Sequence, residues 1–387
     1  MQKRNILFLS SWYPNRIKPT HGNFVFQHAL AASQFHHVQM LYVCLDDQLK
    51  GGVEIVQSNG SFSTTIAYIP KSNIPLIGSI WNNLRIILCY FNLLQGLKKK
   101  GFHPELIHAN VVYPIGIIAR LLSIRHKIPY IISEHWTCYH QEAYPRPSKI
   151  QQILTRMVAN KAKMILPVSE DLANAMRRSG IRTHMNVVYN VIDTSLFIPG
   201  EKSKRLGNQL VHVSSLDPIQ KNPRLLFSAF AELIKWNPEL HLHIVSDGDF
   251  SIFHEELTQR NIQQNIVFHG TLDAAGIAAL LKDSDLFVLT SRFENLPCVL
   301  IESISAGVPI VSTNVGGIHE IIDLEQGQLV PSEDQGALVL AIKEQLSRLD
   351  KYDSNKMHQK AMQKFSYQAI GSRFAGIYET IIDTHVS

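Results

Sequence analysis

Glu294 and Glu302 lie eight residues apart, and a predicted helix begins between them. The apolar run before them ends near Thr290, and Pro297 suits the first residue of a helix that extends to Ala306. The turn would then lie at the carboxyl end of a parallel strand, where doubly wound sheets bind ligands. The spacing therefore puts two carboxylates beside a candidate binding site.

The same turn could bind a phosphate. The backbone amides of Asn295 and Leu296, exposed at the start of the helix, would attract an anion. Glu294 would face this ligand, and Glu302, inside the helix, could accept hydrogen bonds from a ribose diol. Taken alone, the pair could equally be one capping acid and one surface acid.

Charge is distributed unevenly along the chain. The 387 residues carry 37 Lys and Arg against 32 Asp and Glu, and 45% are hydrophobic, which excludes a disordered or collagen-like protein. Residues 1–198 hold 21 basic and 9 acidic side chains (+12), whereas residues 199–387 hold 16 and 23 (−7). The basic half predicts an anionic partner, such as phospholipid or a phosphorylated substrate, unless its charge is merely solvated. No RNA- or DNA-binding module is recognisable, so we expect no nucleic acid.

Four cysteines stand at positions 44, 89, 138 and 298, too far apart for a zinc ribbon or a disulfide framework. We expect reduced thiols. No signal peptide is recognisable after Met1, and apolar runs such as residues 86–91 are much shorter than the ~20 residues of a membrane span. These observations predict a cytoplasmic protein.

Apolar, β-branched runs alternate with helical stretches, which is typical of an α/β protein with parallel sheets covered by helices. The expected strands are residues 6–10, 38–43, 106–109, 130–133, 164–168 and 187–190, then 210–214, 240–245, 266–268, 286–289 and 310–312. The series restarts after a charged stretch with Gly and Pro at residues 199–207, which we interpret as a linker. We therefore expect domains at 1–198 and 199–365, and a closing helix within 366–387.

Residues 80–97 have a helical pattern with apolar side chains on two sides, and Lys98, Lys99 and Lys100 follow at once. Such a helix could lie in a membrane surface, where each Lys or Arg adds roughly 1 kcal/mol near anionic lipid. The alternative is a helix buried on two sides in a large domain.

Segment 291–317 resembles the EX7E region of retaining glycosyltransferases of family 4, which have the GT-B fold. Segment 187–199 is similar to the family's P-N-G-V-D-x-x-x-F-x-P stretch, with Tyr189 and Val191 in place of the usual Pro and Gly. Further similarity covers residues 12–14, 22–24, 244–249, 268–271 and 280–291. The resemblance implies two Rossmann-like, doubly wound domains that face a cleft, the first binding the acceptor, the second the donor, with the last helix packing back on the first.

Carried over to this sequence, the resemblance assigns Glu302 to the ribose and Glu294 to sugar hydroxyls of the donor. Lys221 matches the lysine that pairs with the donor pyrophosphate, and a cation there would stabilise the departing phosphate. Ser215 stands where the family usually has Arg, which removes one phosphate donor. Gly22 and Asn23 match the first loop and would also meet the diphosphate.

On the acceptor side, His135 follows an expected strand, where the family has a histidine that faces the cleft. It could position the acceptor or donor sugar, or be a structural histidine. His108 is a second candidate, and Glu134 could be a base or fix the tautomer of His135. We find no metal-binding pattern, such as HExxH or a DxD after a strand, and expect neither a metal nor a cofactor.

The resemblance implies a metal-independent hexosyltransferase that retains anomeric configuration. It would move a sugar from a nucleoside diphosphate, UDP being the commonest, to a glycan or an anionic lipid-linked acceptor in polysaccharide, capsule or lipopolysaccharide biosynthesis. We expect peripheral contact with the inner face of the membrane through residues 80–100. The alternatives are a non-catalytic GT-B binding subunit and, among enzymes, a nucleotide-sugar epimerase or a phosphorylase.

Overall fold

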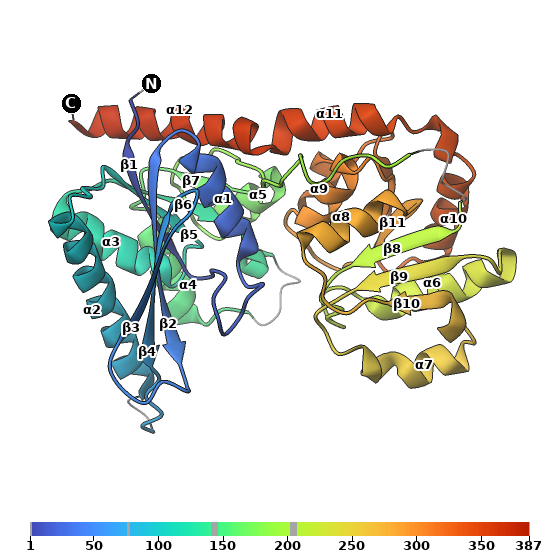
Figure 1. Ribbon diagram of the computed structural model, residues 1–387, viewed down its shortest axis with the longest axis horizontal. Coiled ribbons are helices and arrows are strands. Elements are labelled where there is room, and N and C mark those ends of the chain that lie inside the picture. The colour runs from blue at the N-terminus through green and yellow to red at the C-terminus, as the bar shows by residue number, and fades with distance from the viewer. Residues whose placement is uncertain (1, 76–77, 141–145, 202–206, 387) are drawn as a thin grey trace. The chain divides into compact units, whose positions relative to one another are not determined.

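The computed structural model describes residues 2–75, 78–140, 146–201 and 207–386 and divides into two compact units (Figure 1). Unit 1 comprises residues 1–168, 172–191 and 367–387, and unit 2 comprises residues 169–171 and 192–366. The chain thus passes from unit 1 to unit 2 after Val191, seven residues before the boundary expected from sequence. Within the expected linker 199–207, residues 202–206 lie outside the described residues.

Unit 1 is built on a seven-stranded sheet in the order β3-β4-β2-β1-β5-β6-β7, parallel except for the β3–β4 pair. Its strands are β1 (Asn5–Ser10), β2 (His37–Asp46), β3 (Glu54–Asn59), β4 (Ser63–Pro70), β5 (Leu106–Asn110), β6 (Tyr130–Glu134) and β7 (Ile165–Pro167). The central strands β1, β5 and β6 are almost wholly buried, because helices cover both faces of the sheet. This arrangement brings the carboxyl ends of β1, β5 and β6 to one edge.

The helices of unit 1 form two packed groups. In the first, α1 packs against α12, and in the second, α3 packs against both α2 and α4. The helices are α1 (Asn23–Ser33), α2 (Gly78–Lys99), α3 (Ile115–His126), α4 (Lys149–Ala159), α5 (Glu170–Arg178) and α12 (Tyr367–Val386). Although α12 is the last helix of the chain, its Ile370, Phe374 and Tyr378 belong to the same core as Phe8 and Val25.

Unit 2 contains a six-stranded parallel sheet in the order β10-β9-β8-β11-β12-β13. The strands are β8 (Gln209–Val213), β9 (His241–Val245), β10 (Ile266–Phe268), β11 (Leu286–Leu289), β12 (Ile310–Thr313) and β13 (Gly327–Val330). The helices are α6 (Pro223–Trp236), α7 (His254–Gln259), α8 (Ala274–Lys282), α9 (Cys298–Ser305), α10 (Gln335–Leu346) and α11 (Ser354–Phe365). Adjacent β8 and β11 therefore deliver the loops that follow them to the same edge.

The expected strand at residues 187–190 is wrong. The backbone there runs beside β7, and the Val188 amide donates to the Pro167 carbonyl at 3.0 Å, but only one isolated bridge, from Ile165 to Met185, forms. Val187 and Val188 are nevertheless buried, which explains why their residue types suggest a strand.

Candidate active site

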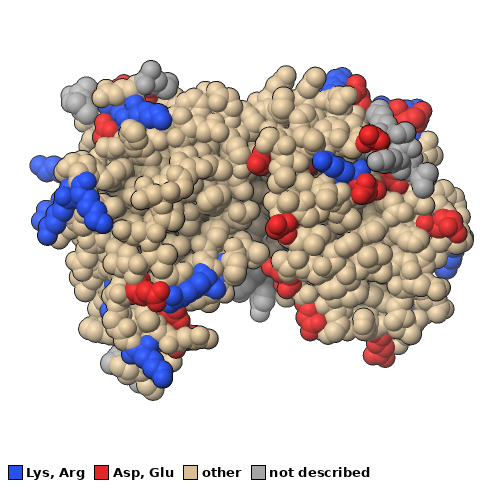
Figure 2. All heavy atoms as spheres, in the orientation of Figure 1, with Lys and Arg blue, Asp and Glu red and all other residues tan. Residues whose placement is uncertain are grey.

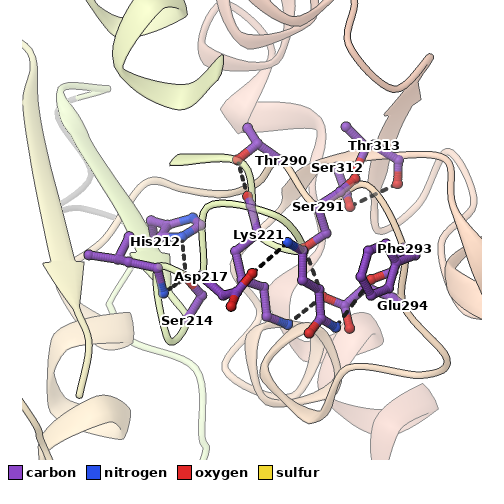
Figure 3. A network of polar contacts seen from close by, with 12 residues as sticks. His212, Ser214, Asp217, Lys221, Thr290, Ser291, Phe293, Glu294, Ser312 and Thr313 are labelled. Atoms are coloured by element: carbon purple, nitrogen blue, oxygen red, sulfur yellow. Dashed lines mark hydrogen bonds and ion pairs between the residues drawn. The ribbon is translucent and has the colours of Figure 1, made fainter. Parts of the chain in front are cut away.

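The loop between β11 and α9 holds Glu294 in a buried, hydrogen-bonded position. The residue is 5% exposed. Its Oε1 atom lies 2.5 Å from Lys221 Nζ and accepts a hydrogen bond from the Ser291 hydroxyl at 2.7 Å (Figure 3). The structure therefore brings together Glu294 and Lys221, two residues that are 73 positions apart in the sequence.

Lys221 is positioned by the turn that follows β8. Asp217 Oδ1 accepts hydrogen bonds from the amides of Ile219 and Gln220, and the Lys221 amide donates to the Asp217 carbonyl at 2.8 Å. The Thr290 hydroxyl, just after β11, donates to the Lys221 carbonyl at 3.0 Å (Figure 3). The turn that follows β8 is thus tied directly to the end of β11.

Arg292 supports the same turn and was not identified from the sequence. Its Nη1 atom donates to the Pro218 carbonyl at 2.6 Å, and its Nη2 atom donates to Asn222 Oδ1 at 2.9 Å. Its guanidinium also pairs with Glu333. Because these partners occupy the guanidinium, Arg292 fixes the loop that carries Lys221.

The turn after β12 closes over the Glu294 loop and requires a glycine. Gly316 has a φ of +55°, and a Cβ atom there would lie 1.9 Å from the Glu294 carbonyl oxygen. The neighbouring Gly317 amide donates to the Asn295 carbonyl at 2.9 Å. A side chain at position 316 would therefore displace the backbone of Glu294.

Glu302 lies in α9, and its buried Oε2 atom has no hydrogen-bond partner among the described residues. Burial raises the pKa of this carboxyl to about 7. Burial, then Glu302 and, to a smaller extent, Glu294 raise the pKa of the Cys298 thiol to about 12, and Lys221 opposes this shift, so these three groups lie near one thiol. A buried acceptor of this kind is suited to a ligand hydroxyl.

Three further residues of unit 2 were expected to bind the donor, and two of them, Asn295 and Leu296, are buried whereas Ser215 is exposed. Asn295 and Leu296 are only 5% and 3% exposed, and the expected binding of an anion by their backbone amides stays a prediction. They are buried because the loop folds under the turn at Gly317, and the helix itself begins at Cys298. Ser215 is exposed, and its carbonyl oxygen would lie 2.3 Å from a Cβ atom at Gly248.

In unit 1, Gly22 and Asn23 lie at the start of α1. Gly22 has a φ of +74°, and a Cβ atom there would lie 2.5 Å from the Trp12 carbonyl, so glycine allows the first loop to pack tightly. Asn23 is the first residue of α1 and is exposed. Trp12 in turn meets Trp136 edge to face, with ring centroids 5.9 Å apart.

His135 follows β6 and packs within an aromatic cluster. Its ring centroid lies 4.3 Å from that of Phe24 and 5.1 Å from that of His28. Burial lowers its pKa well below the usual value, and a hydrogen bond to Asn190 opposes this shift. His135 is therefore a neutral imidazole at the carboxyl end of the sheet of unit 1.

Glu134 is a structural acceptor and not the base that the sequence suggested. It is fully buried and accepts hydrogen bonds from the amides of Val112, His135 and Trp136, each at 2.8 Å, and from the Tyr139 hydroxyl at 3.0 Å. Four donors occupy its two oxygens, so Glu134 organises the loop after β6. It contacts the backbone of His135 and does not fix the tautomer of the ring.

His108 is likewise a core residue and not an acceptor contact. It is fully buried, with Nδ1 2.6 Å from the Tyr378 hydroxyl and Nε2 2.8 Å from the Ser133 hydroxyl. Burial lowers its pKa well below the usual value. Both ring nitrogens are therefore engaged inside unit 1.

A pocket of about 370 Å³ opens beside the loop after β6. Tyr113, Trp136 and Tyr139 line it, together with Arg146, Arg156 and Arg178. Aromatic faces stack on sugar rings, and guanidinium groups bind carboxylates and phosphates. In the described part of the chain, no cluster of three His, Cys, Asp or Glu residues could hold a metal ion, and no helix is long and apolar enough to cross a membrane.

Comparison with known proteins identifies the family. Residues 26–196 match the model for "Glycosyltransferase Family 4", and residues 207–348 match that for "Glycosyl transferases group 1". A protein of Salmonella typhimurium named as a colanic acid biosynthesis glycosyltransferase, WcaL, is 31% identical over 299 residues, which cover 72% of this chain and 69% of that protein. The chain belongs to glycosyltransferase family 4.

Solved structures of GT-B glycosyltransferases match the fold of this family 4 chain. Sucrose-phosphate synthase from Thermosynechococcus elongatus superposes with a TM-score of 0.79 at 18% identity, covering 98% of this chain and all of that one. Anabaena HepE in complex with UDP and glucose gives a TM-score of 0.73 at 18% identity, covering 97% and 99%. The family and the GT-B fold class expected from sequence are thus confirmed.

The matches with curated relatives are shorter than those with solved structures. The chain spans between 46% and 63% of the length of four further relatives, which include glycosyltransferases of Bacillus and Arabidopsis.

Proposed function

We propose that this chain transfers a hexose from a nucleoside diphosphate sugar to an acceptor hydroxyl with retention of anomeric configuration. One observation carries the proposal: the Lys221–Glu294 pair, on the loops that follow β8 and β11, lies near the same thiol, Cys298, as Glu302 on α9. The buried Oε2 atom of Glu302 has no hydrogen-bond partner among the described residues. The lysine is suited to the diphosphate, Glu294 to sugar hydroxyls and Glu302 to the ribose. Ligands commonly bind at this edge of a parallel sheet.

In the proposed reaction, the bond between the anomeric carbon and the phosphate oxygen breaks. A bond from that carbon to the acceptor oxygen forms on the same face, and the acceptor proton passes to the departing phosphate. No protein nucleophile is needed, and Lys221 would stabilise the charge that develops on the diphosphate. We propose accordingly that neither a metal nor a cofactor takes part, and that His135 orients a sugar as a neutral imidazole.

UDP is the first nucleotide to test, because HepE is a structural neighbour of this chain and has been crystallised with UDP and glucose. For the acceptor, we propose a glycan with carboxylate or phosphate groups. The pocket in unit 1 with three arginines and three aromatic residues suits such a molecule. The names of WcaL and of TuaC from Bacillus subtilis refer to colanic and teichuronic acid biosynthesis, which supports a role in polysaccharide formation.

We further propose that the protein works at the inner face of a membrane, on a lipid-linked acceptor. Support comes from α2, whose Ile80, Trp81, Leu84 and Leu88 are between 49% and 63% exposed. This helix ends at Lys98 and Lys99. The alternative of a helix buried on two sides is therefore wrong.

The test is the melting temperature of the protein with UDP, GDP, dTDP or ADP, beside the Glu302→Ala variant. A ligand at 100 times its dissociation constant stabilises the folded state by about 2.7 kcal/mol. We expect a shift with one nucleotide that is lost in the variant. Absence of a shift with all four would contradict the proposed donor site and favour a binding subunit, since the exposed Ser215 stands where the family usually has Arg.

A further inference from the structure

One group of helices in unit 1 has no acidic side chain. The helices α2, α3 and α4 carry seven Lys and Arg residues and neither Asp nor Glu: Arg85, Lys98, Lys99, Arg120, Arg125, Lys149 and Arg156. They lie in a row, since α3 packs against both neighbours. On the face of the molecule drawn in Figure 2, acidic side chains are concentrated over unit 2. The helices therefore present a cationic surface.

The same helices expose large apolar side chains to solvent. Besides the four on α2, Ile124 of α3 is 65% exposed, and Ile150, Ile153 and Met157 of α4 are 50% to 70% exposed. On α4 these three residues recur at helical spacing on one side of the helix. Exposed apolar residues framed by cations, without anions, are typical of a surface that meets anionic lipid.

A groove of about 460 Å³ lies between α2 and the edge strand β3. Its walls are mostly apolar, with Ile55 on β3, Ile69 on β4 and Leu88, Leu93 and Leu97 on α2, and none of the described residues that line it is Asp or Glu. Volumes of roughly 300–1,000 Å³ are common in ligand sites. The groove thus has the volume of a ligand site and an apolar lining suited to a hydrocarbon chain.

The groove has a cation at each end. Arg85 donates to the Pro70 carbonyl at 2.7 Å, and Lys100 lies 3.5 Å from Gln57 Oε1. These residues are 15 positions apart, which corresponds to about 22 Å along a helix. One leaflet of a bilayer has a hydrocarbon depth of ~15 Å, so one acyl chain fits this length.

We propose that the β3–α2 groove binds one acyl chain of an anionic phospholipid, with the phosphate at the exposed Lys99 and Lys100. Cations at the carboxyl end of α2 also complement the helix dipole, so this end is the favourable one for a basic cluster. The inference rests on the proposed membrane contact and deepens it, because it adds a defined binding site for one lipid to a general contact with the membrane surface. It involves no residue of the donor site in unit 2.

The variant Gly96→Phe tests this site. Gly96 lines the groove, and a Cβ atom at this position would meet no atom within 4 Å, so the ring can enter the groove without disturbing the core. Gly376→Phe is the matched control. It places the same ring at an exposed position of α12 in the same unit, where a Cβ atom also meets nothing within 4 Å.

The probe is a phosphatidylglycerol with a photoactivatable acyl chain in phosphatidylcholine vesicles, and labelled peptides are mapped by mass spectrometry. We expect labelling on β3 and α2 in the unmodified protein, a decrease of about tenfold or more in Gly96→Phe and no decrease in Gly376→Phe. Labelling that maps elsewhere, or that persists in Gly96→Phe, would overturn the groove site.

Two further measurements separate this inference from the proposals on which it depends. If the protein floats with anionic vesicles but the groove is not labelled, the membrane contact stands and the groove site is wrong. The nucleotide-dependent melting shift of Gly96→Phe should equal that of the unmodified protein, since the donor site lies in unit 2. Labelling of the groove that is equally strong in a neutral photoactivatable lipid would contradict the role of the phosphate.

Discussion

Glu294 and Lys221 neutralise one another in the structure, with 7% and 17% of their side chains exposed. A diphosphate that enters the site would compete with Glu294 for the lysine. The carboxylate would then be released toward the sugar hydroxyls. The pair can therefore change partners when the donor binds, whereas Ser291 continues to hold Glu294 through its hydroxyl.

Glu294→Gln keeps the shape of the side chain and removes its charge. We expect turnover to fall by roughly two decades or more, as loss of a positioning group can cause. Nucleotide affinity should not decrease, because the variant leaves Lys221 free for phosphate. Steady-state kinetics and calorimetric titration with the nucleotide measure the two effects. Glu239→Gln, at an exposed position, is the control, and unchanged turnover in Glu294→Gln would refute the role assigned to this residue.

Glu302 makes stability depend on pH. Its pKa is about 7 in the folded state against 4.5 as an ordinary glutamate, so the folded protein holds a proton that the unfolded chain has released. This proton contributes roughly 3 kcal/mol to the free energy of unfolding. The contribution is fully present below pH 4.5 and is lost as pH rises through about 7. Denaturant unfolding at several pH values should show a flatter profile for Glu302→Gln. Parallel profiles would contradict this assignment.

At the residue scale, the candidate residues of the site could be chosen from the sequence, but the residues that support them could not. Glu294, Glu302 and Lys221 belong to recognisable segments, and they lie near one another. Arg292 was missed because its role depends on partners from another loop, such as Pro218, and Ser291 because its role depends on how this loop turns the hydroxyl toward Glu294. His108 and Glu134 were misinterpreted, since a polar side chain at a strand end can point into the core or out of it.

At the scale of elements, short apolar strands were predicted well, whereas the hairpin with more polar strands was not. β10 and β11 match their expected ranges, because they are short runs of apolar residues. The hairpin of β3 and β4 was missed, since every residue of β3 is exposed and its sequence is mostly polar. Asn59, the last residue of β3, and Gly60, which follows it, are a turn signal that could have revealed the hairpin.

Helix α12 is attached to unit 1 through the buried Tyr378 hydroxyl, which meets His108 Nδ1. Tyr378→Phe would leave this buried nitrogen without its partner, so we expect a loss of about 1–3 kcal/mol in the free energy of unfolding. Tyr367→Phe, at the half-buried start of α12, should cost less because water can replace its contact with Gln27. Denaturant unfolding compares them, and equal losses would contradict a buried anchor.

At the scale of the whole molecule, the opposite charges of the two halves predict salt-dependent membrane binding. Replacing Lys98, Lys99 and Lys100 by Gln should weaken flotation with anionic vesicles by about tenfold or more. Binding should also weaken between 0.1 M and 1 M salt, as the Debye length falls from ~10 Å to ~3 Å. Gln substitutions at Lys235, Lys343 and Lys351 in unit 2 serve as the control. Flotation that is indifferent to anionic lipid would refute the contact.

Unit 1 is completed by a segment that follows unit 2 in the chain, and the contact between His108 and Tyr378 spans 270 positions. During synthesis, nearly all of unit 2 emerges before α12 is available. Since domains fold as their chains emerge, the apolar face of α1 stays uncovered until α12 has been synthesised. Released chains that end before Tyr367 should thus contain a folded unit 2 and an incomplete unit 1.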